Sequence, residues 1–157
     1  MKVLFVCLGN ICRSPTAHAI FRDICQKAHF DCEIDSAGTS AEHEGETPAP
    51  RAVRAAVGIS FAGITSRAVR AADFAYFDYI LAMDKHNLAN LQRICPEAYQ
   101  HKIRLVLSFH SDYPKWSEVP DPYYGGAKDF QSVCELLQDA SRNLLQELQR
   151  QSAKLSR

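Results

Sequence analysis

Residues 2–15 read KVLFVCLGNICRSP, and this stretch carries the strongest structural signal in the chain. Residues 2–8 are a short apolar run with β-branched members that stops at Gly9, which predicts a buried strand. Ser14 and Pro15 predict the start of a helix, because Ser is a good N-cap and Pro is favoured at the first helical position. Apolar residues then recur at spacings of three and four along one helical face: Ala17, Ile20, Phe21, Ile24 and Ala28.

The same alternation of strand and helix continues along the rest of the chain. Residues 39–50 and 110–126 contain several Pro and Gly residues and are predicted as loops. We therefore expect a single α/β domain over residues 1–157, a three-layer fold with a four-stranded parallel sheet and helices on both faces. The further strands are predicted over residues 32–36, 77–83 and 103–109, and the further helices over residues 50–57, 84–95 and 127–149.

The loop between the first strand and the first helix is expected to bind phosphate. In such folds ligands lie beyond the carboxyl ends of the strands, where a helix N-terminus presents backbone N–H groups and positive potential. Gly9 and Asn10 tolerate the positive φ angles that a tightly wound loop requires. Arg13 can bind a phosphate dianion with its guanidinium in a bidentate manner. The expected members of the phosphate-binding loop are Leu8, Gly9, Asn10, Ile11, Cys12 and Ser14.

Cys7 lies at the base of this loop and is the candidate nucleophile. The positive field that binds a phosphate also favours the thiolate, which is the reactive form of cysteine. A hydrogen bond from the Ser14 hydroxyl would favour it further. The expected reaction is in-line attack of the sulfur on phosphorus, while Arg13 and the loop hold the equatorial oxygens. The alternative interpretation of Cys7 as a small buried apolar residue stays open at this point.

Asp121 is the candidate proton donor for the leaving oxygen. Pro120 and Pro122 restrict the loop on both sides of it and would hold the carboxyl group in place. Because Asp-Pro also starts ordinary turns, the spacing alone leaves a purely structural role open. Tyr123 and Tyr124 follow directly, and they either line a cleft for an aromatic group or pack inside the protein.

Composition excludes several other classes of protein. The chain has 157 residues, with 18 Lys and Arg against 18 Asp and Glu, so its formal net charge is zero. This balance argues against a nucleic-acid binder, and no apolar run is long enough to span a membrane. Six cysteines without a C-x-x-C pair predict free thiols in the cytoplasm rather than a disulfide framework or a zinc site. We therefore expect neither a metal nor another cofactor.

Three separated motifs resemble those of the low-molecular-weight protein tyrosine phosphatases. They are residues 7–15 (CLGNICRSP), 35–39 (DSAGT) and 121–125 (DPYYG), and residues 77–84 (FDYILAMD) are also similar to the family. The resemblance covers essentially the whole chain in the same order of elements. It implies a metal-independent protein tyrosine phosphatase that works through a cysteinyl-phosphate intermediate. Acid phosphatase activity is a second activity that the resemblance suggests. We expect a monomer whose partner is a phosphotyrosine-containing protein, with a tyrosine kinase as one candidate.

The resemblance assigns the chemical steps to particular residues. By this similarity Cys7 is the nucleophile and Arg13 binds the phosphoryl group. Asp121 is the general acid and then the base that activates water. Tyr123 and Tyr124 flank the entrance of the substrate cleft.

The resemblance also assigns supporting roles around the nucleophile. Asn10 and Ser14 are expected to shape the loop and its thiolate, and Ser36 is expected to support Asn10. Cys12 resembles a second loop cysteine that forms a reversible disulfide with Cys7 after oxidation and so protects it. A packing role at the start of the helix is the alternative for Cys12.

The chain departs from the usual family pattern at three positions. Many members have Trp where Glu42 stands, and residues 40–46 contain three acidic residues and no aromatic one. This side of the substrate cleft therefore either lacks a wall or selects basic residues next to the phosphotyrosine, unless the segment is simply a solvated acidic loop. The family commonly has Glu at His18 and Asp at Ala49, so contacts that depend on those two carboxylates are expected to differ here.

Two related enzyme activities and one binding function are the alternatives. Phosphoarginine phosphatases resemble this loop but have Thr at the position of Ile11, and a branched apolar residue suits an aromatic ring better than a guanidinium. Thiol-dependent arsenate reductases share the loop but pass electrons through a close pair of cysteines, whereas Cys95 and Cys134 are far apart in the sequence. A phosphopeptide-binding module without catalysis would require neither Cys7 nor Asp121.

Overall fold

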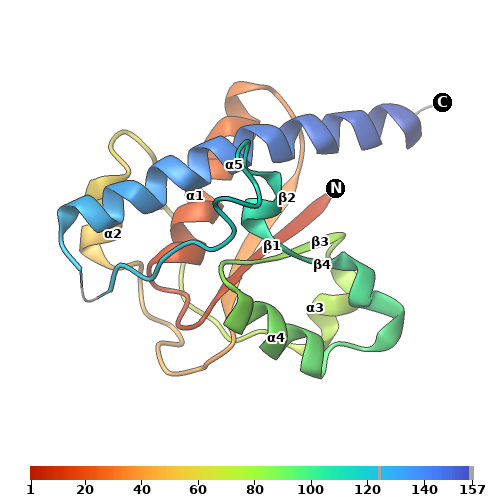
Figure 1. Cartoon of the computed structure of the whole chain (residues 1–157), viewed down its shortest axis with the longest axis horizontal. Coiled ribbons are helices and arrows are strands. Elements are labelled where there is room, and N and C mark those ends of the chain that lie inside the picture. Colours follow the sequence, from red (N-terminus) through yellow and green to blue (C-terminus); the bar gives the residue numbers. More distant parts are fainter. Residues whose placement is uncertain (124, 156–157) are drawn as a thin grey trace.

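A sheet of four parallel strands forms the centre of the computed structural model, which describes residues 1–123 and 125–155. The strands are β1 (Lys2–Cys7), β2 (Glu33–Gly38), β3 (Tyr79–Ala82) and β4 (Ile103–Leu105), in the spatial order β2-β1-β3-β4. The helices are α1 (Arg13–Lys27), α2 (Pro50–Ala55), α3 (Ala71–Tyr76), α4 (Lys85–Ile94) and α5 (Ala127–Leu155), with short 3-10 helices η1 (Glu97–Lys102) and η2 (Val106–Phe109) (Figure 1). The predicted single-domain α/β fold with a four-stranded parallel sheet is confirmed.

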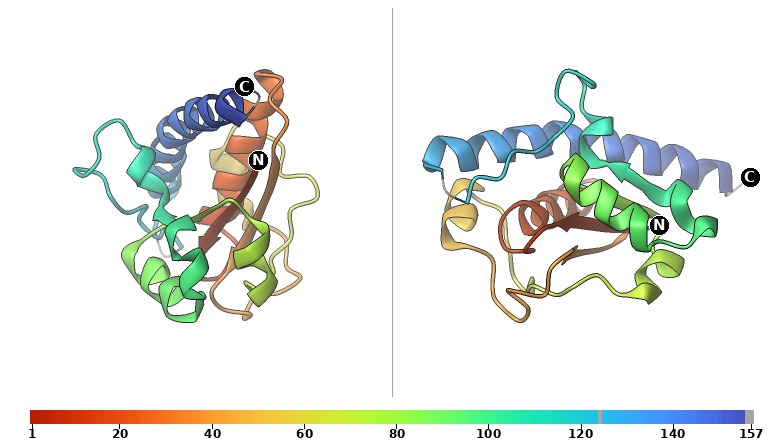
Figure 2. Two further views of the ribbon diagram at one scale, coloured as in Figure 1. Left: turned by 90° about the vertical axis from the view of Figure 1, so that its right-hand side faces the viewer. Right: turned by 60° about the horizontal axis from the view of Figure 1, so that its bottom comes forward.

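Alternation along β1 divides the core into two apolar layers, one on each face of the sheet. Val3, Phe5 and Cys7 belong to the cluster that includes residues of α1 and α5. Leu4 and Val6 belong to the cluster that includes residues of α3 and α4. Figure 2 shows the two helical layers on opposite sides of the sheet. Because β1 is covered on both faces, its sequence is a continuous apolar run rather than an alternation of apolar and polar residues.

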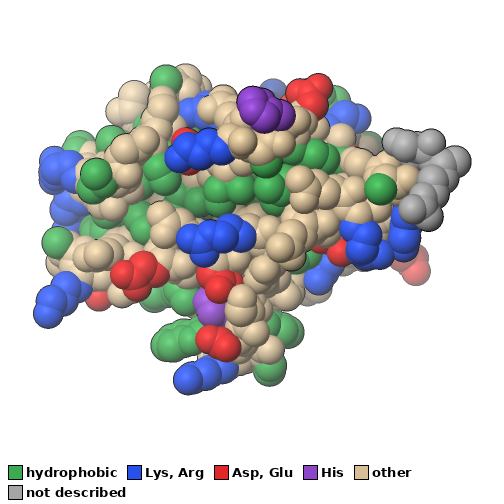
Figure 3. Space-filling view, turned by 90° about the horizontal axis from the view of Figure 1, so that it is seen from above, with side chains coloured by type: hydrophobic (Ala, Val, Ile, Leu, Met, Phe, Trp, Pro, Cys, Tyr) green, Lys and Arg blue, Asp and Glu red, His purple; other side chains and the backbone are tan. Residues whose placement is uncertain are grey.

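The longest helix, α5, packs on α1 through the apolar stripe that its sequence predicts. The stripe residues that are buried are Phe130, Val133, Leu137, Ala140, Leu144 and Leu148. The helix continues to Leu155, beyond the predicted end at residue 149. On the face of the molecule drawn in Figure 3, Lys and Arg side chains are interspersed with Asp and Glu, in keeping with the balanced charge of the sequence.

The prediction and the structure differ at two elements, one predicted as a strand and one not predicted. The strand predicted over residues 103–109 ends at Leu105, and the chain turns into η2, where Val106 and Leu107 are buried. A continuous apolar run does not distinguish a strand from a buried helical turn, so the error arises from the pattern itself. Helix α3 is absent from the prediction, and at its start the Asp73 carboxylate accepts a hydrogen bond from the backbone N–H of Arg70 at 2.7 Å. None of the described helices combines the length and apolar character needed to cross a membrane.

The carboxyl ends of β1, β2 and β3 meet at one edge of the sheet, and this edge positions the site. Cys7 at the end of β1 is paired with Gly38 at the end of β2. A Cβ atom on Gly38 would lie 2.6 Å from the carbonyl oxygen of Leu8, so only glycine allows the loop after β1 to approach β2 this closely. Val6 is paired with Ala82 of β3, which brings the residues after β3 beside the same loop.

Candidate active site

The sulfur of Cys7 accepts hydrogen bonds from the loop that follows β1. The backbone N–H of Asn10 donates to Cys7 Sγ at 3.2 Å, and the hydroxyl oxygen of Ser14 lies 3.0 Å from the same sulfur. Cys7 is only 3% exposed, so these contacts replace water around the thiol. The contact expected between Ser14 and Cys7 is therefore present, and both groups can donate to a negatively charged sulfur.

Ser14 does not cap the helix as predicted. Helix α1 begins at Arg13 with Cys12 at the N-cap position, and Cys12 makes no side-chain capping hydrogen bond. Ser14 therefore lies inside the first turn, where its hydroxyl contacts the Cys7 sulfur and accepts a hydrogen bond from Asn10 Nδ2 at 2.7 Å. The capping prediction is wrong because the site uses this hydroxyl for tertiary contacts.

Asn10 holds the loop in its tight conformation. Its φ angle is 57°, in the left-handed region that Asn tolerates better than most residues. Its side chain is buried and satisfied at both ends, since Nδ2 donates to Ser14 and Oδ1 accepts from the backbone N–H of Arg67 at 3.0 Å. Gly9 lacks the predicted positive φ. Glycine instead leaves room for the His43 side chain, because a Cβ atom would lie 2.9 Å from its Cδ2.

Ser36 does not support Asn10 directly, contrary to the expectation. The Ser36 hydroxyl lies 3.0 Å from Nδ1 of His18, the residue that stands where the family commonly has Glu. Both side chains are buried between α1 and β2. Burial lowers the pKa of His18 to about 4, and the charge of Asp35 only partly opposes this effect. His18 is consequently neutral near neutral pH and forms an uncharged hydrogen bond with Ser36.

Arg13 is buried and held from two directions. Its Nη1 donates to Oδ2 of Asp84 at 2.6 Å and to the carbonyl oxygen of Val119 at 3.0 Å, and the residue is 4% exposed. Asp84 also caps α4 by accepting from the backbone N–H of Asn87 at 2.7 Å. The guanidinium is therefore oriented by two rigid elements, α1 and α4, before any substrate is bound.

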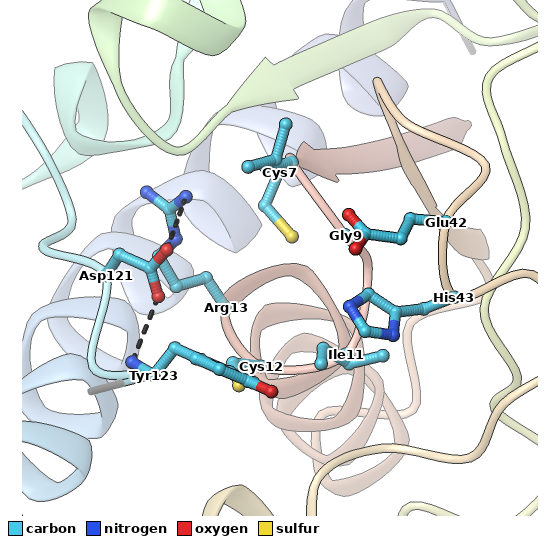
Figure 4. A pocket seen from close by; sticks show the side chains of 10 residues that line it. Cys7, Gly9, Ile11, Cys12, Arg13, Glu42, His43, Asp121 and Tyr123 are labelled. Carbon is cyan, nitrogen blue, oxygen red and sulfur yellow. Dashed lines mark hydrogen bonds and ion pairs between the residues drawn. The ribbon is translucent and has the colours of Figure 1, made fainter. Parts of the chain in front are cut away.

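Asp121 lies at the mouth of the site, facing Arg13. Its Oδ2 is 3.8 Å from Nη2 of Arg13, and its Oδ1 accepts from the backbone N–H of Tyr123 at 3.1 Å (Figure 4). The carboxyl group is 51% exposed, so it can exchange protons with water. The segment is attached to the sheet where the N–H of Val119 donates to the carbonyl of Met83 at 2.8 Å.

These side chains enclose a pocket of about 190 Å³. In Figure 4 Arg13 and Asp121 lie on one side, Glu42 and His43 lie on the opposite side, and the sulfur of Cys7 is at the base. Leu8, Gly9, Ile11, Cys12 and Tyr123 complete the lining. Tyr124, predicted at the cleft entrance, lies outside the described residues.

Cys12 lines the same pocket but has a different environment from Cys7. It is buried in a small apolar cluster with Ala52 and Phe130. Burial raises the pKa of Cys12 to about 11, and the nearby negative charges of Cys7 and Asp121 add to this effect. At neutral pH Cys12 is therefore a protonated thiol beside the candidate nucleophile.

Three residues at the site are missing from the sequence-based prediction. Asp84 directly follows the predicted strand 77–83, and neighbouring parallel strands end at the same edge, so its place near Cys7 could have been inferred. His43 packs against Gly9 and pairs with Glu46. Arg67 comes from a loop with no recognisable pattern, and although burial opposes its charge, Asp73 and Asp35 raise the pKa of its guanidinium.

The described residues contain no group of three or more His, Cys, Asp or Glu side chains arranged to hold a metal ion.

Leu8 is among the exposed large apolar residues, and it lies on the open side of the loop. Beside the pocket, a wider hollow of about 830 Å³ shares Ile11, His43 and Tyr123 with it. A substrate larger than a phosphate therefore has room to extend from Cys7 across this side of the molecule.

The fold and the site define a small α/β protein with a cysteine-containing phosphate-binding loop at the carboxyl edge of its sheet. Residues 2–154 match the family model described as low molecular weight phosphotyrosine protein phosphatase. A Bacillus subtilis relative, low molecular weight protein-tyrosine-phosphatase YfkJ, is 40% identical over 155 residues, covering 96% of this chain and 97% of the relative. The chain belongs to the low molecular weight phosphotyrosine protein phosphatase family.

Other relatives and solved structures agree with this assignment. The low molecular weight phosphotyrosine protein phosphatase of Schizosaccharomyces pombe is 42% identical over 156 residues, covering 94% of this chain and 97% of the relative. A crystal structure of a protein tyrosine phosphatase from Entamoeba histolytica superposes with a TM-score of 0.91 at 44% identity. That comparison covers 97% of this chain and 99% of the other, so the similarity extends over the whole fold.

Proposed function

We propose that this protein hydrolyses phosphotyrosine in proteins through a cysteinyl-phosphate on Cys7. The observation that carries the proposal is the hydrogen bonding of the Cys7 sulfur by Asn10 and Ser14 at the base of a pocket walled by Arg13 and Asp121. These donors stabilise negative charge on the sulfur, which is the form that attacks phosphorus. Family membership supports the same chemistry.

In the first step the Cys7 sulfur attacks phosphorus opposite the tyrosine oxygen. A phosphorus–sulfur bond forms while the bond from phosphorus to the phenolic oxygen breaks. Asp121 gives its proton to that oxygen, so tyrosine leaves as a neutral phenol. The Arg13 guanidinium and the loop N–H groups bind the equatorial oxygens, where charge concentrates in the transition state.

In the second step water releases the phosphoryl group. The carboxylate of Asp121 accepts a proton from a water molecule whose oxygen attacks phosphorus, and the phosphorus–sulfur bond breaks. The products are inorganic phosphate and the Cys7 thiolate, and Asp121 is protonated again for the next cycle. The half-exposed position of its carboxyl group, within 3.8 Å of Arg13, suits both transfers.

The walls of the pocket favour an aromatic leaving group. Ile11 and Tyr123 line the space between Cys7 and the wider hollow, and Leu8 adds apolar surface. A planar phenyl ring buries well against such side chains, whereas the guanidinium of phosphoarginine would lose water without gaining a partner from Ile11. We therefore favour phosphotyrosine over phosphoarginine.

The arsenate reductase alternative is disfavoured by the positions of the other cysteines. Cys95 packs in the apolar cluster with α3 and α4, and Cys134 packs in the cluster with α1 and α5. These two clusters lie on opposite faces of the sheet, so the two thiols cannot form a disulfide in the folded protein. Electron transfer through this pair has no route to Cys7.

We further propose that Cys12 protects Cys7 by forming a disulfide with it after oxidation. A thiol that stays protonated at neutral pH reacts slowly with peroxide itself but can attack an oxidised neighbour. The raised pKa of Cys12 and its place on the same pocket support this division of roles.

Six free cysteines also fit a reducing cytoplasm, and we propose a monomer that acts there on phosphotyrosine-containing proteins, tyrosine kinases among them.

A panel of phosphopeptides tests the proposed activity. With EDTA present, phosphotyrosine peptides should be hydrolysed and phosphoserine and phosphoarginine peptides should react at least about 100-fold more slowly, and vanadate should inhibit. Efficient phosphoarginine hydrolysis would contradict the role given to Ile11.

Glu42 lines the pocket whereas Glu44 does not, so Glu42→Gln should raise KM for peptides with basic flanking residues and Glu44→Gln should change it less.

A further inference from the structure

A second pair of cysteines comes together at the other end of α1. Cys25 lies in the last turns of α1, and Cys32 lies just before β2. The chain reverses between them, because the N–H of Phe30 donates to the carbonyl of Cys25 at 2.9 Å and Glu33 pairs with Lys2 of β1. This reversal returns Cys32 to the side of Cys25.

The two cysteines line the same hollow, which opens to solvent. Cys25 belongs to the apolar cluster between the sheet and α1, Cys32 packs against that cluster, and each thiol shifts the pKa of the other. The hollow has a volume of about 310 Å³, and its other walls include Arg22, Gln26 and Phe30. Cys25 is 3% exposed and Cys32 is partly exposed, so a small solute reaches Cys32 more readily than Cys25.

We propose that Cys25 and Cys32 are a second oxidisable dithiol, which hydrogen peroxide converts to a disulfide independently of the active site. The Cys32 sulfur attacks one peroxide oxygen, the oxygen–oxygen bond breaks, and the other oxygen leaves as water after taking up a proton. Cys32 is then a sulfenic acid. The Cys25 sulfur attacks the Cys32 sulfur, a sulfur–sulfur bond forms, and the hydroxyl leaves as a second water with the Cys25 proton. Peroxide gains the two electrons that the thiols lose.

The local electrostatics support this order of events. The neighbouring Cys25 thiol lowers the pKa of Cys32, and the Cys32 thiol together with burial raises the pKa of Cys25. Cys32 therefore carries more thiolate and reacts first, while Cys25 keeps its proton until it attacks the sulfenic acid. The greater exposure of Cys32 points to the same assignment.

This pair is separated from Cys7 and Cys12 by the length of a helix. Cys12 precedes the first residue of α1 and Cys25 is near its end, so about 20 Å of helix lies between them. Thiol exchange between the two pairs would require unfolding of α1. Oxidation of Cys25 and Cys32 should instead join the end of α1 to the start of β2, across a hollow that His18 also lines, without blocking Cys7.

Peptide mapping of the full-length protein after peroxide treatment tests the proposal. Free thiols are blocked with iodoacetamide, and trypsin then places Cys25 in residues 23–27, Cys32 in residues 28–51, and Cys7 with Cys12 in residues 3–13. In the wild type we expect the first two peptides to be joined, two hydrogen atoms lighter than their sum, and to separate after thiol reduction. The same linked pair should form in Cys7→Ser, which cannot form the active-site disulfide.

Matched variants keep the result interpretable. Cys32→Ser should abolish the linked pair while leaving turnover of an aryl phosphate within about twofold of wild type, and Cys134→Ser, a buried cysteine of the same cluster, should retain the pair. In Cys7→Ser, peroxide treatment should raise the melting temperature by a few degrees, because the new link restrains the unfolded chain. Recovery of Cys25 and Cys32 as separate alkylated peptides after full oxidation of Cys7, or conversion of Cys32 to sulfinic acid without linkage, would overturn the proposal.

Discussion

Arg13 and Asp84 lie 71 positions apart in the sequence, yet Nη1 of Arg13 donates to Oδ2 of Asp84 at 2.6 Å. The contact joins the first turn of α1 to the start of α4 across the edge of the sheet. Because the guanidinium is almost fully buried, its orientation is fixed by this carboxylate rather than by water. The phosphate-binding loop is thereby organised before substrate arrives, and binding energy is not spent on orienting Arg13.

Replacing Asp84 should separate its charge from its capping role. Asp84→Asn keeps a good N-cap for α4 but removes the partner of Arg13, so kcat/KM for an aryl phosphate should fall about 10-fold to 100-fold. Asp84→Ala should lose about 1 kcal/mol more stability than the Asn variant, measured by urea unfolding, because the cap is also lost. Glu118→Gln is the control, since Glu118 accepts from Lys85 N at the same helix start. Equal activity in Asp84→Asn and wild type would contradict a positioning role.

The Ser14 hydroxyl should control the reactivity of the Cys7 sulfur. In Ser14→Ala one hydrogen bond to the thiolate is lost, so alkylation by iodoacetate at neutral pH should slow about 10-fold and kcat should fall by a similar factor. Ser36→Ala removes a buried hydroxyl of the same kind that contacts His18 instead, and it should leave alkylation nearly unchanged. If both variants were alkylated as fast as the wild type, the hydroxyl would have no part in activating Cys7.

Loss of the Asp121 carboxyl group should depend on the leaving group. Asp121→Asn cannot donate a proton, so hydrolysis of substrates with poor phenol leaving groups should slow by about 100-fold or more, and substrates with good leaving groups should be affected less. The measurement is the dependence of the hydrolysis rate on the pKa of the leaving phenol, which should be steeper in Asp121→Asn than in the wild type. Asp129→Asn changes a carboxylate in the first turn of α5 that accepts from the backbone N–H of Gly126, and it should show the wild-type dependence. A uniform loss across substrates would indicate a structural role for Asp121.

Burial of His18 should make the fold less stable in mild acid. The pKa is lowered from 6.5 to about 4 in the folded protein, so between these values the unfolded chain binds a proton that the folded chain does not. Stability should therefore fall as pH decreases from about 6.5 to about 4, by about 3 kcal/mol for this group. Urea unfolding across this range should show a smaller loss for His18→Gln, whereas the exposed His101→Gln should behave like the wild type. An unchanged pH dependence in His18→Gln would contradict the assignment.

The local pattern in residues 2–15 was sufficient to predict β1, the phosphate-binding loop and α1. Alternation of apolar elements likewise predicted the parallel sheet and the buried stripe of α5. These features depend on short-range periodicity and on residue types with strong conformational preferences. Such local features are the part of a fold that can be predicted most directly from a sequence.

The contacts that complete the site depend instead on the assembled fold. Arg67 reaches Asn10 from a distant loop, and Asp84 reaches Arg13 from the end of β3. Ser14 resembles an N-cap in the sequence, but the neighbouring sulfur and Asn10 take its hydroxyl. The family resemblance predicts that Ser36 supports Asn10, whereas the Ser36 hydroxyl contacts Nδ1 of His18, which stands in place of the usual Glu.

Trapping the phosphoryl group on Cys7 is the most direct test of the mechanism. Asp121→Asn is mixed with excess aryl phosphate that has a good leaving group, quenched by denaturation within the first turnover, and digested for mass spectrometry. The peptide of residues 3–13 should carry one phosphoryl group on Cys7, with a burst of phenol equal to the enzyme concentration. Cys7→Ser should give neither signal. Phenol release without phosphorylation of Cys7, or a phosphoryl group on another residue, would contradict nucleophilic attack by Cys7.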